Sequence, residues 1–402
     1  MSELDHTAVA EAVDRRFDDI VDLRRSLHQI PEVAHQEIRT TDLIRNRMSS
    51  LGLSERPAGT PTGAVFTLDG SQPGRTVLLR ADIDGLPVGE EVDVEFASRV
   101  DGHMHACGHD GHAAMLMGVA EALASRAEDL PGRYAFLFQP AEEGGMGARR
   151  MIEGGVLDGL GADRALGCHL TSGMVPSGLV AMRPGIQLAD GRLLDFQLQG
   201  TGGHGALATR EGNVILAAAA LAGCLGSVAD DLTFHDVPCV CSAGTIHAGT
   251  APNVVPRTAR LTGTLRTFTP DQTSEALARL EEVRAGLAEE FAVQVDVTET
   301  AHLPAVDNDG ASLEVLSHVA GAVIGHDRVV TAMPPVTPSD DMSEFLNRIP
   351  GCYFFVGATP EGGSGAHHSP TFRIDEEALR TGARVMAAGA VAFAREQRLS
   401  ES

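Results

Sequence analysis

Short, nearly continuous apolar segments constrain the fold of this chain more than any other feature of its sequence. Residues 76–80 and 134–139 are such segments, and they are typical of strands covered on both faces of a sheet. Segments with apolar residues at helical spacing lie between the strands, for example after His112. Strands that alternate with helices predict an α/β fold built on a mostly parallel sheet.

The pattern changes in the middle of the chain. Strands are predicted at 194–199, 240–247, 260–268 and 293–298, and helices at 213–228 and 270–292. This βαββαβ order is typical of a ferredoxin-like arrangement, a small antiparallel sheet with two helices on one face. A length of 402 residues also exceeds what one hydrophobic core usually organises. We therefore predict an α/β domain formed by residues 1–186 and 301–402, with a second domain inserted at 187–300.

The bulk composition excludes several classes of partner. The 55 acidic residues outnumber the 31 basic ones, and the net charge of -24 repels nucleic acid and anionic lipid. No segment approaches the ~20 apolar residues that a membrane helix needs. The N-terminal residues lack the layout of a secretory signal, and six cysteines in so long a chain do not form a disulfide scaffold. We expect a cytoplasmic protein that binds neither nucleic acid nor membranes.

The strongest local signal is the segment HMHACGHDGH at residues 103–112. It holds four imidazoles, a thiol and a carboxylate within ten positions, which are ligands that borderline transition metals prefer. Cys107 and His109 can face one cation because Gly108 permits a turn between them. A polar loop with chance histidines is the alternative, but the density of ligands favours metal binding.

Carboxylates follow two of the predicted strands directly. Glu142 and Glu143 come after the strand at 134–139, where open α/β sheets place their ligand crevice. One of them can bind a metal while the other moves protons, although an acidic pair could also favour the dipole of the next helix. Asp84 follows the strand at 76–80 and could orient a metal-bound histidine, or simply form a turn with Gly85.

The remaining candidates are single residues with plausible structural alternatives. His169 and His368 are candidate ligands, although a lone histidine is more often structural. In the inserted domain, His204 lies among glycines between a strand and a helix, where a plain turn is the alternative. Asn253 and Arg266 could supply polar contacts to a substrate, and Arg266 could equally form a cross-strand ion pair.

Taken in order, these motifs resemble the dinuclear-metal aminoacylase and carboxypeptidase family, and within it the hippurate hydrolases and plant auxin-conjugate hydrolases. The resemblance runs nearly end to end, through LHQIPE, RADIDGLPV, FASRVDGHMHACGHDGH, QPAEEGG, GTIHAGTAPNVVPRTARLTGTLRTF and HHSPTF. It implies a metallohydrolase domain with an inserted lid and dimerisation domain. It also implies a homodimer, or a larger oligomer built from dimers.

The resemblance further implies roles for individual residues. The general base would be Glu142, and Asp84 would be the orienting aspartate. His204 would reach from the lid domain into the active site of the partner subunit. Two divalent ions per subunit, Zn, Mn, Co or Ni, would be held by five protein ligands: Cys107, His109, Glu143, His169 and His368.

The reaction expected from such a site is hydrolysis of the amide bond of an N-acyl amino acid or a similar small N-acyl amine. Two ions that share a water lower its pKa towards ~7, and Glu142 takes the proton and passes it to the departing nitrogen. His204 would support the oxyanion, while Asn253 and Arg266 would bind the substrate carboxylate. A dipeptidase or carboxypeptidase with the same site is the nearest alternative. A metal-binding protein without turnover is another, but open coordination positions favour catalysis.

Three positions depart from the pattern of the family. Ala208-Thr209 stands where Pro-His is frequent, Asp340-Asp341-Met342 replaces the usual Glu-Asp-Phe, and Thr171 replaces an aromatic residue. None of these departures removes a proposed ligand. All three lie where substrate selection is plausible, so the aromatic acyl groups familiar in the family are not assigned to this chain.

Overall fold

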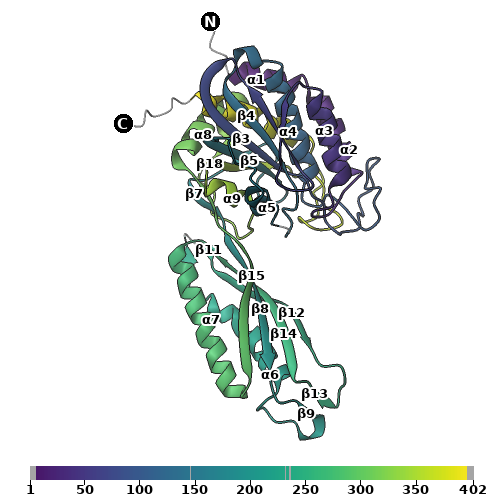
Figure 1. The fold of residues 1–402 in the computed structure, drawn as a ribbon, viewed down its shortest axis with the longest axis vertical. Helices are drawn as coiled ribbons and strands as arrows, with labels where there is room; N and C mark the ends of the chain where they lie inside the picture. Colours follow the sequence, from purple (N-terminus) through teal and green to yellow (C-terminus); the bar gives the residue numbers. More distant parts are fainter. Residues whose placement is uncertain (1–5, 145, 231, 235–236, 396–402) are drawn as a thin grey trace. The chain divides into compact units, whose positions relative to one another are not determined.

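The computed structural model describes residues 6–144, 146–230, 232–234 and 237–395 (Figure 1). It contains two compact units. The first comprises the described residues of Met1–Gly185, Asp307–Met333 and Asp341–Ser402, and the second comprises those of Ile186–Val306 and Pro334–Asp340.

The first unit is built on an eight-stranded sheet with the order β1-β2-β4-β3-β5-β18-β6-β17. These strands are β1 (Ser54–Arg56), β2 (Ala64–Asp69), β3 (Gln72–Asp82), β4 (Pro131–Gln139), β5 (Arg164–Thr171), β6 (Val180–Ala181), β17 (Val329–Val330) and β18 (Gly351–Gly357). Strand β3 pairs in parallel with β4 and β5, and β5 pairs in parallel with β18. The predicted α/β fold with a mostly parallel sheet is therefore confirmed.

Helices cover this sheet and complete its core. They are α1 (His6–Asp14), α2 (Phe17–His28), α3 (Ile38–Ser49), α4 (His109–Ala124), α5 (Gly147–Glu153), α8 (Gly310–Ile324), α9 (Met342–Leu346) and α10 (Glu377–Arg395). Helix α10 packs against α1, α4 and α8 and against the central strands β3, β4 and β5. Leu79, Phe136 and Leu166 from those strands are fully buried, as their continuous apolar runs predict.

The second unit has the predicted βαββαβ order. Its elements are β8 (Asp190–Gln199), α6 (Val214–Val228), β12 (Val240–Ala248), β14 (Thr258–Thr267), α7 (Pro270–Phe291) and β15 (Gln294–Leu303). The strands pair antiparallel in the order β12-β14-β8-β15, and both helices pack on the sheet and on each other. Buried and less buried residues alternate along β14, so one face of the sheet carries a core of its own.

Shorter elements connect these parts of the chain. They are the strands β7 (Gly185–Leu188), β9 (Gly203–His204), β10 (Thr233–Phe234), β11 (Val237–Pro238), β13 (Val254–Val255) and β16 (Val306–Asn308), and the 3-10 turns Ala127–Asp129, Gly205–Leu207 and His326–Arg328. Among the described residues, no helix is long and apolar enough to cross a membrane.

The parallel arrangement places the candidate residues of the first unit together. Because β3, β4 and β5 run in the same direction, their carboxyl ends meet at one edge of the sheet. Asp84 lies just after β3, Glu142 and Glu143 lie just after β4, and His169 lies near the end of β5. Helix α4 begins at His109, in the segment with the highest density of candidate ligands.

Candidate metal centre

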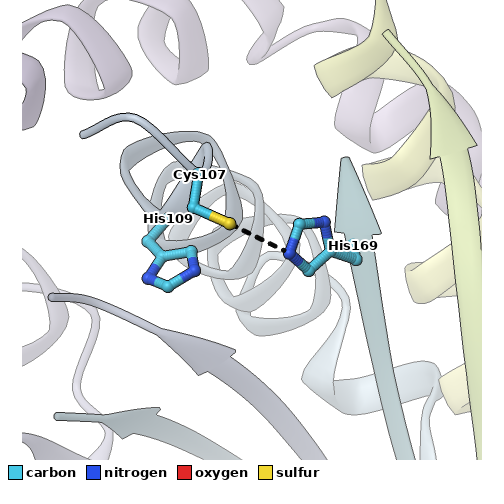
Figure 2. Close-up of side chains that lie close together, drawn as sticks. All are labelled: Cys107, His109 and His169. Carbon is cyan, nitrogen blue, oxygen red and sulfur yellow. Dashed lines mark hydrogen bonds between the residues drawn. The ribbon is translucent and has the colours of Figure 1, made fainter. Parts of the chain in front are cut away.

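Cys107 and His109 are brought to the site by a turn at Gly108. Gly108 has a φ of 91°, a left-handed conformation that suits glycine, and α4 starts immediately after it. The Sγ of Cys107 lies 3.5 Å from the Nε2 of His169, which projects from β5 (Figure 2). Two ligands predicted from distant parts of the chain are therefore adjacent.

One ring nitrogen of His109 contacts Asp84, and the other faces the cluster of candidate metal ligands. Its Nδ1 lies 3.0 Å from the carbonyl oxygen of Asp84 and 3.2 Å from the Oδ1 of that residue. The other carboxylate oxygen, Asp84 Oδ2, accepts a hydrogen bond from the backbone N–H of Glu143 at 3.0 Å. The Nε2 of His109 is buried and has no hydrogen-bond partner among the described residues. A buried ring nitrogen without a hydrogen-bond partner is a position that a metal ion can fill in place of a proton.

Glu143 and His368 complete the cluster from β4 and from the C-terminal part of the unit. The Oε1 of Glu143 lies 3.0 Å from the Nε2 of His368 and 3.9 Å from the Nε2 of His109. Three sets of side chains offer ligand atoms that all lie within 4.8 Å of one another: Cys107 with His109 and His169, Cys107 with Glu143 and His368, and His109 with Glu142 and Glu143. The structure thus brings together all five predicted ligands and the predicted base.

The charges around the cluster favour a bound cation. Burial raises the pKa of the Cys107 thiol to about 12, so the sulfur keeps its proton at neutral pH unless a cation replaces it. Burial opposes a charge on His109, but Asp82, Cys107 and Asp84 together outweigh it and raise the pKa of His109. Burial, together with the neighbouring rings of His112 and His367, lowers the pKa of His169, so this ring is neutral and retains a lone pair.

Two residues at the site have unusual backbone conformations. Ala141, just before Glu142, has a φ of 58°, and His368 has a φ of 66°. The N–H of Ala141 donates to Glu37 Oε1 at 2.9 Å, and the N–H of His368 donates to the carbonyl of Ala106 at 2.8 Å. Left-handed conformations of non-glycine residues cost about 1–3 kcal/mol each and persist where surrounding contacts hold them. Glu37 is not among the residues predicted from the sequence, where its only signal is a carboxylate at the start of a predicted helix.

A second imidazole from the HHSP segment also reaches the cluster. The Nδ1 of His367 lies 3.6 Å from Cys107 Sγ, and its Nε2 accepts a hydrogen bond from the backbone N–H of Ser172 at 3.1 Å. Because Nε2 is an acceptor, Nδ1 carries the proton and can donate to the sulfur. The adjacent pair of histidines was the signal in the sequence, but it did not indicate which ring faces the thiol.

The candidate residues of the inserted domain lie in two places within the second unit. His204 and Asn253 lie on neighbouring segments, because β9 pairs with β13 and the N–H of Gly205 donates to the carbonyl of Asn253 at 2.7 Å. His204 is exposed, and its Nδ1 accepts a hydrogen bond from the N–H of Ala206 at 3.1 Å. Arg266 lies at the other end of β14, about 26 Å along a strand that rises about 3.3 Å per residue from Thr258.

The three departures from the family pattern lie in different surroundings. Thr171 is the buried last residue of β5. Thr209 is exposed, and its hydroxyl donates to the carbonyl of Glu211 at 3.2 Å. Asp340 is buried, and Asp341 is a buried partner of Arg80, with their nearest polar atoms 2.8 Å apart.

Comparison with known proteins identifies the family of the chain that carries this site. The model of peptidase family M20/M25/M40 matches residues 78–391, which is most of the chain. The chain belongs to peptidase family M20/M25/M40. Membership makes this M20/M25/M40 protein a metal-dependent amidohydrolase, as the ligand cluster indicates.

Several relatives of this M20/M25/M40 protein match along nearly their whole length. Thermostable carboxypeptidase 1 of Saccharolobus solfataricus is 35% identical over 94% of this chain and 96% of its own. N-acetylcysteine deacetylase of Bacillus subtilis is 34% identical over 92% of this chain and 96% of its own. An IAA-amino acid hydrolase of Arabidopsis thaliana is 34% identical over 96% of this chain and 88% of its own.

A solved structure supports the same assignment. A dinuclear metal binding peptidase of the M20 family from Bacillus subtilis superposes with a TM-score of 0.80 at 31% identity, covering 95% of this chain and 99% of its own. The M20/M25/M40 protein described here therefore shares the fold of a two-metal enzyme, and its own ligand cluster is of the kind that binds metal ions.

Proposed function

We propose that this protein hydrolyses the amide bond of N-acyl amino acids or similar small N-acyl amines. The observation that carries the proposal is the buried Nε2 of His109, which faces the Cys107, Glu143 and His169 ligand groups and has no hydrogen-bond partner among the described residues. Two relatives are named for deacetylation or hydrolysis of such conjugates. Removal of an acyl group from a nitrogen is the reaction that these names share.

The five predicted ligands would hold two ions rather than one. Cys107 belongs both to the group with His109 and His169 and to the group with Glu143 and His368. A sulfur common to two groups supports two neighbouring ions. Thiolate and imidazole ligands suit zinc, cobalt and nickel better than magnesium or calcium, and manganese accepts the carboxylate and imidazole ligands. When bound, such ions lower the pKa of water and polarise a carbonyl group.

The protein's own residues would divide the remaining work. Glu142 accepts a proton from the attacking water on its carboxylate and then donates it to the leaving nitrogen. Glu143 stays a ligand, because its Oε1 faces His368 and His109. Asp84 holds both the His109 ring and the backbone of Glu143, so it keeps the two glutamates in different roles.

A second subunit would complete the site. His204 is separated from the chain connections of the second unit by the length of the sheet, because those connections lie beside the opposite ends of β8 and β15. A partner subunit would supply His204 and Asn253 to this site. The oxyanion of the substrate would accept a hydrogen bond from His204. Arg266, whose Nη1 donates to the Oγ of Ser339 within the second unit, would bind the carboxylate of the substrate.

The proposed dimer would use the β12 edge of the second unit. Strand β12 ends the order β12-β14-β8-β15, so among the described strands one of its edges has no neighbour. Ile246 on β12 and Ile215 and Leu216 on α6 are large apolar side chains that are 43–47% exposed. An open edge flanked by exposed apolar residues favours pairing with a second copy. The second unit would thus act as the lid and dimerisation domain.

The cellular compartment is also part of the proposal. All six cysteines are free thiols, which is typical of a reducing compartment and supports a cytoplasmic location.

A substrate panel with metal-reconstituted enzyme tests this function. The metal-free protein is loaded with Zn²⁺, Mn²⁺ or Co²⁺ and given N-acetyl amino acids and dipeptides that share the same C-terminal residue. We expect a kcat/KM at least ~10-fold higher for the N-acetyl compounds, a difference of ~1.4 kcal/mol in the barrier. A preference for dipeptides would favour the carboxypeptidase or dipeptidase alternative, for which one relative is named.

A further inference from the structure

His112 lies beside the metal cluster but is not one of its five ligands. It is on α4, one turn after His109, and is only 1% exposed. Its Nδ1 lies 2.6 Å from Asp82 Oδ1, and its Nε2 lies 2.8 Å from the backbone nitrogen of Leu170. Both ring nitrogens therefore have a partner, and each partner comes from a strand of the central sheet.

These two partners determine which nitrogen of His112 carries the proton. A backbone N–H can only donate, so Nε2 of His112 must offer a lone pair to Leu170. A carboxylate accepts, so Nδ1 carries the proton and donates it to Asp82. The ring is thus neutral with its proton on Nδ1, and it has no lone pair left for a metal ion. The atoms of Asp82, His109 and His112 lie close enough to hold an ion, but this arrangement makes Asp82 and His112 a supporting pair instead.

Asp82 is kept as an acceptor by a buried arginine. Arg80 Nη1 lies 2.7 Å from Asp82 Oδ2, and Arg80 Nη2 lies 2.8 Å from Asp341 Oδ1. Gln139 connects the same groups, because its Oε1 accepts from Arg80 Nε at 2.8 Å and its Nε2 donates to Asp341. All these side chains are almost fully buried, so each hydrogen bond restricts the positions of the others.

The backbone of Leu170 is held through both of its polar groups, the N–H and the carbonyl oxygen. The last residue of β5 that pairs with β3 is Gly167. The N–H of Leu170, three residues further on, donates to the side chain of His112. The carbonyl oxygen of Leu170 accepts a hydrogen bond from Nδ1 of His169 at 2.6 Å. With its proton on Nδ1, His169 directs its Nε2 lone pair towards Cys107 Sγ, 3.5 Å away.

We propose that His112 is a positioning residue for the metal ligand His169, acting through the backbone of Leu170, and that Asp82 and Arg80 hold His112 in the tautomer this requires. The role rests on the proposed metal ligation by His169. Loss of the His112 acceptor leaves the buried N–H of Leu170 without this partner, and the backbone dihedrals at Leu170 can then change, which moves the adjacent carbonyl that binds His169. The His169 ring loses its fixed orientation, so the affinity for one of the two ions falls.

Two substitutions separate the two hydrogen bonds of His112. The amide oxygen of glutamine in His112→Gln can occupy the place of Nε2 and accept from Leu170. The amide nitrogen of asparagine in His112→Asn can occupy the place of Nδ1 and donate to Asp82, but it leaves the Leu170 N–H unpaired. We measure the dissociation constants of both ions by competition with a chelator. We expect His112→Asn to weaken one ion by ~10–100-fold, the usual effect of losing a residue that supports a ligand, and His112→Gln to weaken it less than ~3-fold.

A third variant tests the tautomer. In Asp82→Asn the amide oxygen would face Arg80, which needs an acceptor, and the amide N–H₂ would face Nδ1 of His112. The His112 proton would then move to Nε2, where it opposes the Leu170 N–H. Nitrogen-15 NMR of the ring should show the proton on Nδ1 in the natural protein and on Nε2 in this variant. Metal affinity should fall by the same ~10–100-fold that is expected for His112→Asn, so Asp82→Asn provides the test if His112→Asn does not fold.

The outcomes separate this role from the proposed function. Equal losses in His112→Gln and His112→Asn, or no loss in either, would overturn the role of the Leu170 contact. A His112 proton on Nε2 in the natural protein would also overturn it. These measurements use metal affinity and NMR, so they remain decisive even if no N-acyl amino acid is hydrolysed. Failure of the substrate panel with a normal His112 result would reject only the substrate assignment.

Discussion

The Nε2 of His169 lies 3.5 Å from the Sγ of Cys107, although 62 positions separate the two residues in the chain. The strand β5 delivers one of them and the turn before α4 delivers the other. Both side chains are therefore positioned by elements of the first unit. This arrangement leads to the first prediction.

Removal of the metal ions should abolish hydrolysis and leave the fold intact. Each unit has a hydrophobic core formed by residues other than the ligands, so folding does not depend on the ions. Prolonged chelation should leave the far-ultraviolet circular dichroism unchanged, and activity should return when Zn²⁺, Mn²⁺ or Co²⁺ is added. Activity that survived complete removal of divalent ions would contradict the mechanism.

The neighbouring glutamates should respond differently to the same change. Glu142→Gln keeps its shape but cannot carry a proton, so kcat should fall at least ~10²-fold while metal content stays near normal. Glu143→Gln removes a charged ligand beside His368 and His109, so metal content should fall. Elemental analysis and steady-state kinetics of both variants test this pair. Metal loss in Glu142→Gln with full retention in Glu143→Gln would mean that the two roles are exchanged.

His204 should act in the active site of the partner subunit. His204→Ala removes one donor to the oxyanion, so kcat should fall by ~10²–10³ without loss of metal. Mixing this variant with Glu142→Gln under conditions that exchange subunits creates heterodimers with one site in which both residues are intact. Activity should then reappear in the mixture. Heterodimers verified by mass spectrometry that remain inactive would exclude donation by the partner.

The β12 edge should carry the dimer contact. Ile246→Lys places a charge on an exposed apolar side chain of β12, so it should yield monomers in light scattering and lower kcat by ~10², as loss of His204 does. Val297→Lys on β15, at the opposite edge of the same sheet, is the matched control because Val297 is 36% exposed. That control should remain dimeric and active. Monomers from Val297→Lys but not from Ile246→Lys would place the interface at the β15 edge and contradict this prediction.

His28 should contribute to stability mainly at low pH. Its two ring nitrogens face carboxylates, Asp110 Oδ2 at 2.7 Å and Glu90 Oε1 at 3.1 Å, with Arg24 beside them. Burial opposes its charge and so does Arg24, but Asp110 and Glu90 outweigh both and raise the pKa of His28. A raised folded-state pKa adds stability that is complete below the unfolded value of about 6.5 and is lost as the pH rises through the folded value.

The measurement is the unfolding free energy of the metal-free protein and of His28→Gln at two pH values. The natural protein should exceed the variant by more at about pH 5.5 than at about pH 9, with a difference on the order of 1–3 kcal/mol at the lower pH. An advantage that grew with pH would show that His28 is neutral in the folded protein.

The main elements of the fold could be predicted because their buried residues follow long, regular patterns in the sequence. The apolar runs of β3 and β4 and the alternation along β8 and β14 each indicate a strand without reference to the rest of the chain. Strands β6 and β17 have two residues each, too few to show a period. They are strands only because β6 pairs with β17 and with β18.

The candidate site was predicted in its composition but not in the arrangement of its histidines. The segment 103–112 contains four imidazoles, and local sequence does not distinguish them. In the structure His103 is half-buried and its Nδ1 lies near the carbonyl of Asp101. His105 is buried, and neither of its ring nitrogens has a hydrogen-bond partner among the described residues, whereas His109 faces the cluster. His109 and His112 lie on one face of α4 because they are three residues apart in a helix.

By itself, the sequence determined the alternating α/β pattern, the inserted βαββαβ segment and the dense set of metal-binding side-chain types at 103–112, because each depends on residues close together in the chain. Only the tertiary structure decided that His112 binds Asp82 and Leu170, and that Glu37 holds the backbone before Glu142. Such contacts join residues tens of positions apart. They depend on strand register and on how helices pack against the sheet, which local patterns of hydrophobicity do not encode.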